Sequence, residues 1–219
     1  MATEHHLQLI TDRRAARGDL PEAVARSLDG GVDSVQVRDK GAPASDLFAS
    51  VLEIQRVTRS SSARVLVNDR VDVALATRAH GVHLAAKSLP PAVSRPLLDI
   101  WQLLGVSVHS VEAAVRAARE GADYVTFGHV FPTWSHEGEP ARGVEMLADV
   151  VAAIDIPVLA IGGITADRVA QVLASGCAGI AVISAILAAR DPAEASRELR
   201  AALDGVSTPP KRTFPERRD

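Results

Sequence analysis

Residues 157–170 read PVLAIGGITADRVA, an apolar run that ends in two glycines and leads into an amphipathic segment. A short run of Val, Leu and Ile is typical of a parallel strand that is buried on both faces. Glycine allows the sharp turn that follows, and the next residues carry apolar side chains at helical spacing. The stretch therefore predicts one strand–turn–helix unit.

The same unit recurs along the whole chain. Amphipathic patterns such as PEAVARSLDGG and VEAAVRAAREGA separate short apolar runs, which we predict as strands at 6–11, 34–39, 64–69, 81–86, 103–109, 124–129, 157–163 and 179–184. Strands that alternate with helices form a parallel sheet with right-handed crossovers. Eight such units predict an α/β fold, a single (β/α)8 TIM barrel over residues 1–205. An open doubly wound sheet is the alternative, but its G-x-G-x-x-G fingerprint is missing after the first strand.

Composition and charge exclude several classes of protein. The net charge of -3 gives no electrostatic case for binding nucleic acid or an anionic membrane. No run reaches the roughly 18 apolar residues that span a bilayer, and the N-terminus lacks the features of a signal peptide. Cys177 is the single cysteine, so no internal disulfide can form. We therefore expect a cytoplasmic protein.

The end of the chain has a different composition. Residues 206–219, VSTPPKRTFPERRD, are rich in proline and charge and have no periodic apolar face. Such a composition predicts a disordered C-terminal tail.

Polar residues follow the predicted strands at their C-terminal ends, where TIM barrels form their active sites. Gln36 and Arg38 alternate with valines and share a side of their strand with Ser34, which predicts that they face the barrel axis. A cation in that position needs an anionic partner or ligand. For Asp12, Arg70 and His109, contact with water explains the polarity equally well. The candidates are Thr11, Asp12, Gln36, Arg38, Asp39, Lys40, Asn68, Asp69, Arg70, Ser107, His109, His129, Thr133, Ser135 and His136.

The turns after the last two predicted strands indicate a phosphate site. Gly162 and Gly163 let a ligand approach the backbone, and Ile183 and Ser184 lead into the last helical region. Loops after strands seven and eight are the usual phosphate site of this barrel. The alternative is that the two glycines merely allow a tight turn.

Several of these motifs together carry a family resemblance over almost the whole chain. The motifs are LITD, VQVRDK, VNDRVDVAL, GVHL, GVSVHS, GADYVTFGHVFPT and IPVLAIGGIT…AVISAI. They resemble the thiamine phosphate synthase superfamily, which implies a (β/α)8 fold. One branch couples an aminopyrimidine pyrophosphate to thiazole phosphate. The TenI-like branch is a thiazole tautomerase that aromatises a thiazole carboxylate phosphate.

Three departures from the synthase pattern favour the tautomerase branch. The synthase reads GPIFPT-x-TK where this chain reads GHVFPTWSH, and GHVF is similar to the tautomerase. In VHLAAKSL, Ser88 stands where the synthase has a second magnesium aspartate, and His136 replaces its lysine. A pyrophosphate-bound Mg²⁺ normally takes more carboxylate help than Asp69 alone supplies. In the other direction, the residues that match the synthase are Gln36, Arg38, Lys40, Asn68 and Asp69.

The tautomerase reading gives each residue a role. His129 is the expected acid/base, because a histidine pKa near 6.5 populates both protonation states at neutral pH; the alternative is a structural histidine bonded to a backbone carbonyl. Arg38 and Gln36 pair the carboxylate, and Gly162, Gly163, Ile183 and Ser184 hold the phosphate. The substrate-binding set is Gln36, Arg38, Lys40, Asn68, Ser107, Thr133, Ser135 and His136.

Two further readings stay open. The first is the synthase, with Mg²⁺ on Asp69; the tautomerase needs no cofactor or metal. The second is a non-enzymatic sensor of thiamine-related ligands. In each case the expected partner is a small molecule, a thiazole phosphate for the tautomerase, with no nucleic acid or membrane. A homodimer is compatible with all three.

Overall fold

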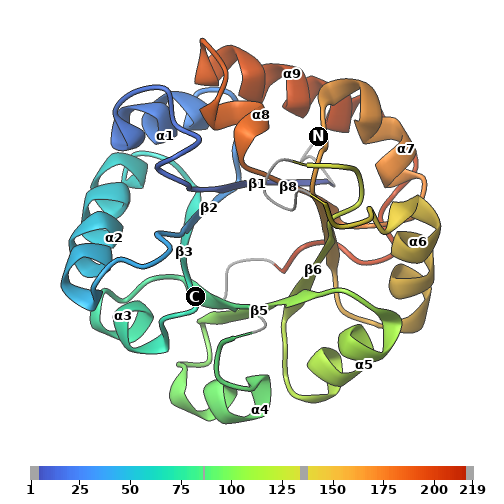
Figure 1. Ribbon diagram of the computed structural model, residues 1–219, viewed down its shortest axis with the longest axis horizontal. Coiled ribbons are helices and arrows are strands. Elements are labelled where there is room, and N and C mark those ends of the chain that lie inside the picture. Colours follow the sequence, from blue (N-terminus) through green and yellow to red (C-terminus); the bar gives the residue numbers. More distant parts are fainter. Residues whose placement is uncertain (1–4, 86, 134–137, 216–219) are drawn as a thin grey trace.

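The computed structural model describes residues 5–85, 87–133 and 138–215, and in this part of the chain the strands close into a barrel (Figure 1). Every strand pairs in parallel with its neighbour in sequence, and β8 returns to β1. The strands are β1 (His6–Ile10), β2 (Ser34–Val37), β3 (Arg64–Asn68), β4 (Gly81–Leu84), β5 (Leu103–Val108), β6 (Tyr124–Gly128), β7 (Val158–Ile161) and β8 (Gly179–Val182). The predicted TIM barrel is confirmed.

Helices surround the barrel on the outside (Figure 1). They are α1 (Leu20–Leu28), α2 (Ala44–Thr58), α3 (Val71–Ala76), α4 (Pro91–Ser94), α5 (Val111–Arg119), α6 (Gly143–Ala153), α7 (Val169–Leu173), α8 (Ser184–Leu187) and α9 (Pro192–Asp204). Short 3₁₀ turns at Arg95–Leu97 and Ala166–Arg168 join this ring. Among these helices none is both long and apolar enough to cross a membrane.

Side-chain oxygens cap the N-termini of three of these helices. Asp19 accepts from the Glu22 amide at the start of α1, Ser110 accepts from Ala113 at α5, and Asp191 caps α9. Each cap satisfies an amide that has no partner inside its helix, which contributes about 1 kcal/mol. These three polar residues therefore help to fix where α1, α5 and α9 begin.

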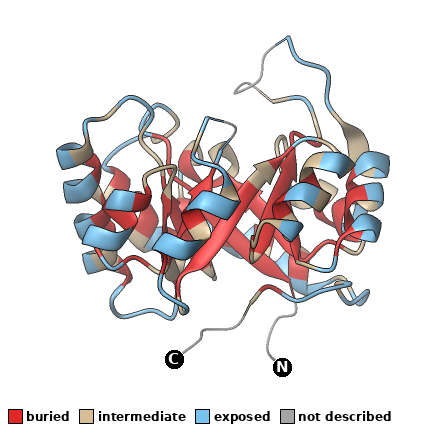
Figure 2. Cartoon of the chain, turned by 90° about the horizontal axis from the view of Figure 1, so that it is seen from below, coloured by how far each residue is buried: buried red, intermediate tan, exposed pale blue. Residues whose placement is uncertain are grey.

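The strands separate two cores because their side chains alternate. Leu7 and Leu9 of β1 face the helices and join the large outer core, while Gln8 between them faces the barrel interior. Figure 2 shows the buried strands as a red centre between helices whose outer faces are exposed. The interior thus receives every second residue of each strand.

Each strand is shorter than its predicted run, by one to three residues, mostly at the C-terminal end. The predicted run 34–39 becomes Ser34–Val37, and 81–86 becomes Gly81–Leu84. The polar residues Arg38 and Lys40 thus follow β2 in the loop at its C-terminal end. This loop end is where a ligand can meet them.

The prediction of a disordered C-terminal tail is wrong for residues 206–215, and 216–219 lie outside the described residues. Phe214 is buried in the barrel interior, where its ring stacks on His6 at a centroid distance of 3.8 Å. Lys211 Nζ donates to the carbonyl oxygens of Val151, Ala152 and Ile154 near the end of α6, at 2.9–3.1 Å. Contacts of individual residues hold this segment, so no periodic apolar pattern marks it.

Phe214 closes the N-terminal end of the barrel, which we call the floor. The ring packs with an apolar cluster in the interior, made of Leu66, Leu103, Tyr124, Leu159 and Ala178. The Arg64 guanidinium lies 4.8 Å from the centre of the Phe214 ring and donates to the Pro215 carbonyl at 2.6 Å. Figure 1 shows the red C-terminal segment entering the ring of strands from the side of α6 and α7.

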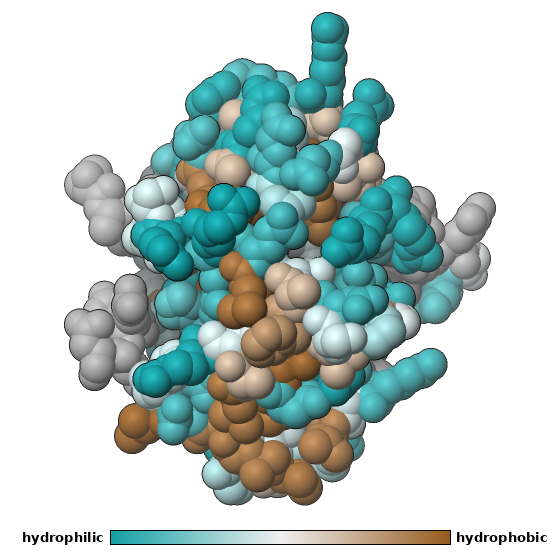
Figure 3. Space-filling view, turned by 90° about the vertical axis from the view of Figure 1, so that its left-hand side faces the viewer, coloured by the Kyte–Doolittle hydropathy of each residue, from teal (hydrophilic) through white to brown (hydrophobic). Residues whose placement is uncertain are grey.

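Exposed apolar side chains gather on one outer face. They belong to α2, α3 and the region around α4, and comprise Phe48, Leu52, Leu75, Leu89, Val93, Leu97 and Ile100. Figure 3 shows this face, with hydrophobic surface concentrated in its lower half.

Candidate active site

Arg38, directly after β2, is held in place by the end of β1. Its guanidinium donates to Asp12 Oδ2 at 2.9 Å, and its backbone amide donates to Thr11 Oγ1 at 2.8 Å. Burial raises the pKa of Asp12, but hydrogen bonds from Arg14 and Arg38 outweigh burial and hold that pKa below its usual value. Thr11 and Asp12 therefore fix a charged Arg38 at the C-terminal end of the barrel, which we call the mouth.

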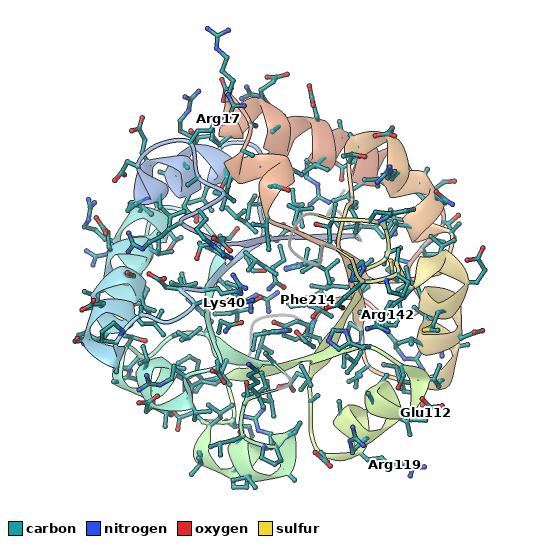
Figure 4. The ribbon with its side chains drawn as sticks, viewed as in Figure 1. Arg17, Lys40, Glu112, Arg119, Arg142 and Phe214 are labelled. Atoms are coloured by element: carbon teal, nitrogen blue, oxygen red, sulfur yellow. The ribbon has the colours of Figure 1, made fainter. Side chains whose placement is uncertain are left out.

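Lys40 adds a second cation to the mouth. Its side chain lies within the ring of strands when viewed down the barrel (Figure 4). The charge of Arg38, followed by burial and the charge of Arg14, lowers the pKa of Lys40. Asp39 does not neutralise this pair, because Arg13 holds the Asp39 carboxylate at 2.8 Å. The arrangement leaves positive charge available to an anionic ligand.

Gln36 and Asn68 meet at the mouth, as neighbours on β2 and β3. Gln36 Nε2 donates to Asn68 Oδ1 at 2.9 Å. The next residue, Asp69, has a φ of 68°, and its amide donates to the His83 carbonyl at 2.8 Å. Arg70 is turned away from this group, because its guanidinium pairs with Asp72.

Ser107 extends the site to β5, where it contacts residues that the sequence analysis did not identify. His83 Nε2 lies 2.9 Å from Ser107 Oγ, and Thr126 Oγ1 lies 3.2 Å from both. On its other side, His83 Nδ1 lies 3.0 Å from the Tyr124 hydroxyl. Burial lowers the pKa of His83 to about 3, so its ring is neutral. The sequence does contain a signal for His83: in GVHL it is a polar residue between two apolar ones, and this alternation indicates a side chain that faces the barrel interior.

His129 is enclosed beside the mouth. Its side chain is 3% exposed, and Nε2 lies 3.3 Å from the Glu139 carbonyl oxygen. The peptide bond between Gly128 and His129 is cis. The Gly128 carbonyl accepts from Arg142 Nε at 2.9 Å and lies 2.8 Å from His109 Nδ1. These bonds tie the end of β6 to the loop before α6.

The two glycines after β7 are required by packing. A Cβ on Gly162 would lie 2.3 Å from the His129 Cβ, and one on Gly163 would lie 2.5 Å from the Pro132 oxygen. Both have positive φ, 102° and 64°, which also favours glycine. The Arg168 guanidinium donates to the Gly163 carbonyl at 2.6 Å. The β7 turn therefore packs directly against the residues that follow β6.

The structure brings most predicted site residues to one end of the barrel, and two lie outside the described part. Arg38, Lys40 and Asn68 follow or end β2 and β3, while Ile183 and Ser184 stand at the start of α8. Thr133 is half-buried in the loop after β6. Ser135 and His136 lie outside the described residues.

Metal-binding capacity at the mouth is limited to isolated donors. The described residues contain no group of three or more His, Cys, Asp or Glu side chains that could hold a metal ion. The Ser88 hydroxyl accepts a hydrogen bond from the Ala85 amide at 2.7 Å. Ser88 therefore supplies no carboxylate at this position, and Asp69 follows β3 at the mouth.

Comparison with known proteins identifies the family. The family model for thiamine monophosphate synthase matches residues 7–186. A putative thiamine-phosphate synthase from Geobacter sulfurreducens is 48% identical over 200 residues, which cover 90% of this chain and 93% of the relative. A thiamine-phosphate synthase from Methanoculleus marisnigri is 44% identical over 198 residues, 90% of this chain and 94% of the relative.

A solved structure agrees with these relatives. The thiamine phosphate pyrophosphorylase from Pyrococcus furiosus superposes with a TM-score of 0.86 at 39% identity, covering 94% of this chain and 98% of that one.

These relatives overturn the expectation of a thiazole tautomerase, and with it that of an isomerase. Relatives that align over almost their full length carry the synthase name. The short GHVF motif, which favoured the tautomerase, is therefore a weaker indicator of function than the similarity over the whole chain. The enclosed His129 ring, near a backbone carbonyl, fits the structural alternative for this histidine. The chain belongs to the thiamine monophosphate synthase family.

Proposed function

We propose that this protein is a thiamine-phosphate synthase, a transferase that joins hydroxymethylpyrimidine pyrophosphate to thiazole phosphate. The observation that carries the proposal is the pair of cations after β2. Arg38 is oriented by Asp12, and the charge of Arg38 acts on Lys40, which forms no ion pair within the described part of the chain. Such a pair suits a pyrophosphate, and relatives with this family's fold carry the synthase name.

The reaction breaks the C–O bond between the pyrimidine methylene and pyrophosphate, and forms a C–N bond to the thiazole nitrogen. Negative charge develops on the departing pyrophosphate. Arg38 and Lys40 stabilise that charge as it forms, which is the differential binding that lowers a barrier. Gln36, Asn68 and Ser107 orient the pyrimidine beside them.

The thiazole phosphate binds on the opposite side of the mouth in this proposal. The backbone of Gly162, Gly163, Ile183 and Ser184 holds its phosphate, since the turns after β7 and β8 are the usual phosphate site of this barrel. Thr133, in the loop after β6, contacts a substrate in this proposal, while Ser135 and His136 lie outside the described residues. His129 supports this loop through its contact with Glu139 and takes no part in proton transfer.

Magnesium fits this site through one protein carboxylate. Mg²⁺ in proteins is commonly held by one or two carboxylates together with substrate phosphates. Asp69 would hold it jointly with the pyrophosphate. When bound, Mg²⁺ supplies further positive charge to the leaving group. Arg38, held by Asp12, and Lys40 share this task.

The test is formation of thiamine phosphate from the two substrates, with Mg²⁺ and with a chelator in parallel. We expect turnover with Mg²⁺. Arg38→Met should lower kcat/KM by about 10²- to 10³-fold, as does removal of one donor that stabilises a developing negative charge. Arg197→Met on the outer face of α9 is the matched control, because its partner is the exposed Glu194. Tight binding without turnover would instead support the sensor and refute the synthase.

The remaining expectations concern the localisation of the enzyme, its ligands and its oligomeric state. We propose a cytoplasmic enzyme that acts on small molecules. The homodimer stays a prediction, which light scattering on the purified protein checks directly.

A further inference from the structure

The turn after β7 directs both of its glycine carbonyls towards the loop that follows β6. The Gly162 carbonyl accepts from the Phe131 amide at 3.1 Å, and the Gly163 carbonyl accepts from Arg168 Nη1 at 2.6 Å. The Arg168 guanidinium lies over the Phe131 ring, with its Cζ 4.7 Å from the ring centre. Both donors therefore lie on the side of the turn that packs on Phe131.

The amides of the same two peptides point the other way. Both peptide bonds are trans, so the N–H of Gly163 is opposite the Gly162 carbonyl, and the N–H of Ile164 is opposite the Gly163 carbonyl. Among the described residues, neither amide has a hydrogen-bond acceptor. Successive backbone amides that point in one direction form a site for an anion. The turn thus offers two adjacent donors on the face away from Phe131.

Bonds from outside the turn are needed to hold this arrangement. Glycine has no Cβ that restricts its backbone, so a Gly-Gly peptide can rotate easily. The Phe131 amide holds the first peptide plane, and Arg168 holds the second. A bulkier residue could not stiffen the turn instead, because a Cβ on Gly163 would lie 2.5 Å from the Pro132 oxygen. Within the described residues, the one hydrogen bond of the Arg168 side chain goes to Gly163.

We infer that Arg168 is a positioning residue that fixes the peptide between Gly163 and Ile164 and so directs their two amides at the phosphate of the thiazole substrate. An oxyanion is the matching ligand, because it accepts both N–H groups at once. Arg168 acts from the carbonyl side of the peptide and does not touch the phosphate. That the phosphate belongs to the thiazole substrate rests on the proposed function, and the direction of the two amides does not.

The direction of the amides is tested without turnover by titrating the ¹⁵N-labelled protein with inorganic phosphate. We expect the amide signals of Gly163 and Ile164 to shift. In Arg168→Met, the Kd for phosphate should rise about three- to tenfold, the loss of one to two net hydrogen bonds. Arg168→Lys keeps a donor within reach of the carbonyl and should bind phosphate nearly as well as the wild type. Wild-type signals of 163 and 164 that do not respond would overturn the inference, whether or not the protein is a synthase.

Salt separates positioning from simple charge attraction. An exposed charge that acts at a distance is screened in about 0.5 M NaCl, whereas a hydrogen bond that holds a peptide is not. The difference in Kd between Arg168→Met and the wild type should therefore persist at high salt. Its disappearance would mean that Arg168 acts through its charge alone and would refute the positioning role.

The effect on the reaction is tested by the two KM values of Arg168→Met. We expect KM for thiazole phosphate to rise about three- to tenfold, with KM for the pyrimidine pyrophosphate unchanged. Arg119→Met, an exposed arginine on the outside of α5 (Figure 4), is the matched control and should change neither. If Arg168→Met does not fold, Phe131→Leu should give the same split, because it removes the ring beneath the guanidinium.

The outcomes distinguish the inference from the proposed function. Equal changes in both KM values, or none, with normal turnover of the wild type would refute the positioning role and leave the synthase standing. A wild type without turnover would refute the synthase, and the phosphate titration would still decide the role of Arg168.

Discussion

The mouth and the floor of this barrel are built from the same strands but satisfy their side chains in opposite ways. At the floor, Phe214 stacks on His6 and packs on Tyr124, whose ring centroid is 4.8 Å away. At the mouth, Lys40 is exposed and repelled by Arg38. The floor is closed by packing, and the mouth keeps charge and hydrogen-bond donors for a ligand. A substitution should therefore affect stability at one end and activity at the other.

The largest expected effect on stability is at the floor. Phe214→Ala removes a buried ring and leaves a cavity among Leu66, Leu103 and Leu159, which should cost about 3–5 kcal/mol in free energy of unfolding. Chemical denaturation measures the change. Phe214→Leu keeps most of the volume and is the control, with a clearly smaller loss. Equal stability of the Ala variant and the wild type would show that the floor does not depend on the C-terminal segment.

Acid should destabilise the interior by the next largest amount. Burial lowers the pKa of His83 to about 3, and burial together with the charges of Arg64 and Arg200 lowers that of His6. Unfolded histidines titrate near 6.5, so below that pH the unfolded state binds more protons. Stability is complete above pH 6.5 and falls as the pH drops towards 3, by about 2 kcal/mol per histidine between pH 7 and 5.

Chemical denaturation at several pH values between 7 and 5 measures this loss in free energy of unfolding. His83→Asn should remove about half of the loss. A wild-type profile that is flat over this range would mean that the two rings are not held neutral in the fold.

A smaller effect is expected where the C-terminal segment meets α6. Lys211→Met removes three hydrogen bonds to carbonyls near the helix end and should cost about 1 kcal/mol. Hydrogen exchange in α6 should rise with it. Arg212→Met is the comparison, because its exposed pair with Asp155 should contribute about 0.5 kcal/mol or less. A larger loss from Arg212 than from Lys211 would contradict this role of Lys211.

The smallest effect on stability is expected at the mouth. Lys40→Met relieves repulsion from Arg38, so the free energy of unfolding should change by about 0.5 kcal/mol or less. The same variant should lose about 10²-fold in kcat/KM with the two substrates. A clear loss of stability with full activity would reverse the comparison between the two ends.

The barrel could be predicted because eight apolar runs alternate with amphipathic segments. Each of these patterns depends only on residues that are close in sequence. Gln36 and Arg38 could be placed on the interior side for the same reason. The contact between His83 and Tyr124 could not, since it joins side chains of β4 and β6 that are distant in sequence. A glycine at 105 had no visible reason until both rings were beside it.

Two expectations from local motifs did not include contacts with residues that are distant in sequence. GHVF favoured a tautomerase, which the relatives contradict, and in the structure Gly162 and Glu139, both distant in sequence, lie against His129. The composition of the tail predicts disorder, but Phe214 contacts residues of β1 and β6. Local composition does not record such long-range contacts.

Tyr124 offers a practical handle on this molecule because it is the single tyrosine among the 219 residues. Biosynthetic incorporation of fluorotyrosine would therefore give one ¹⁹F signal, with no assignment needed. That nucleus would lie between Phe214 below and His83 above. One spectroscopic label would thus report on occupancy at the mouth and on integrity of the floor.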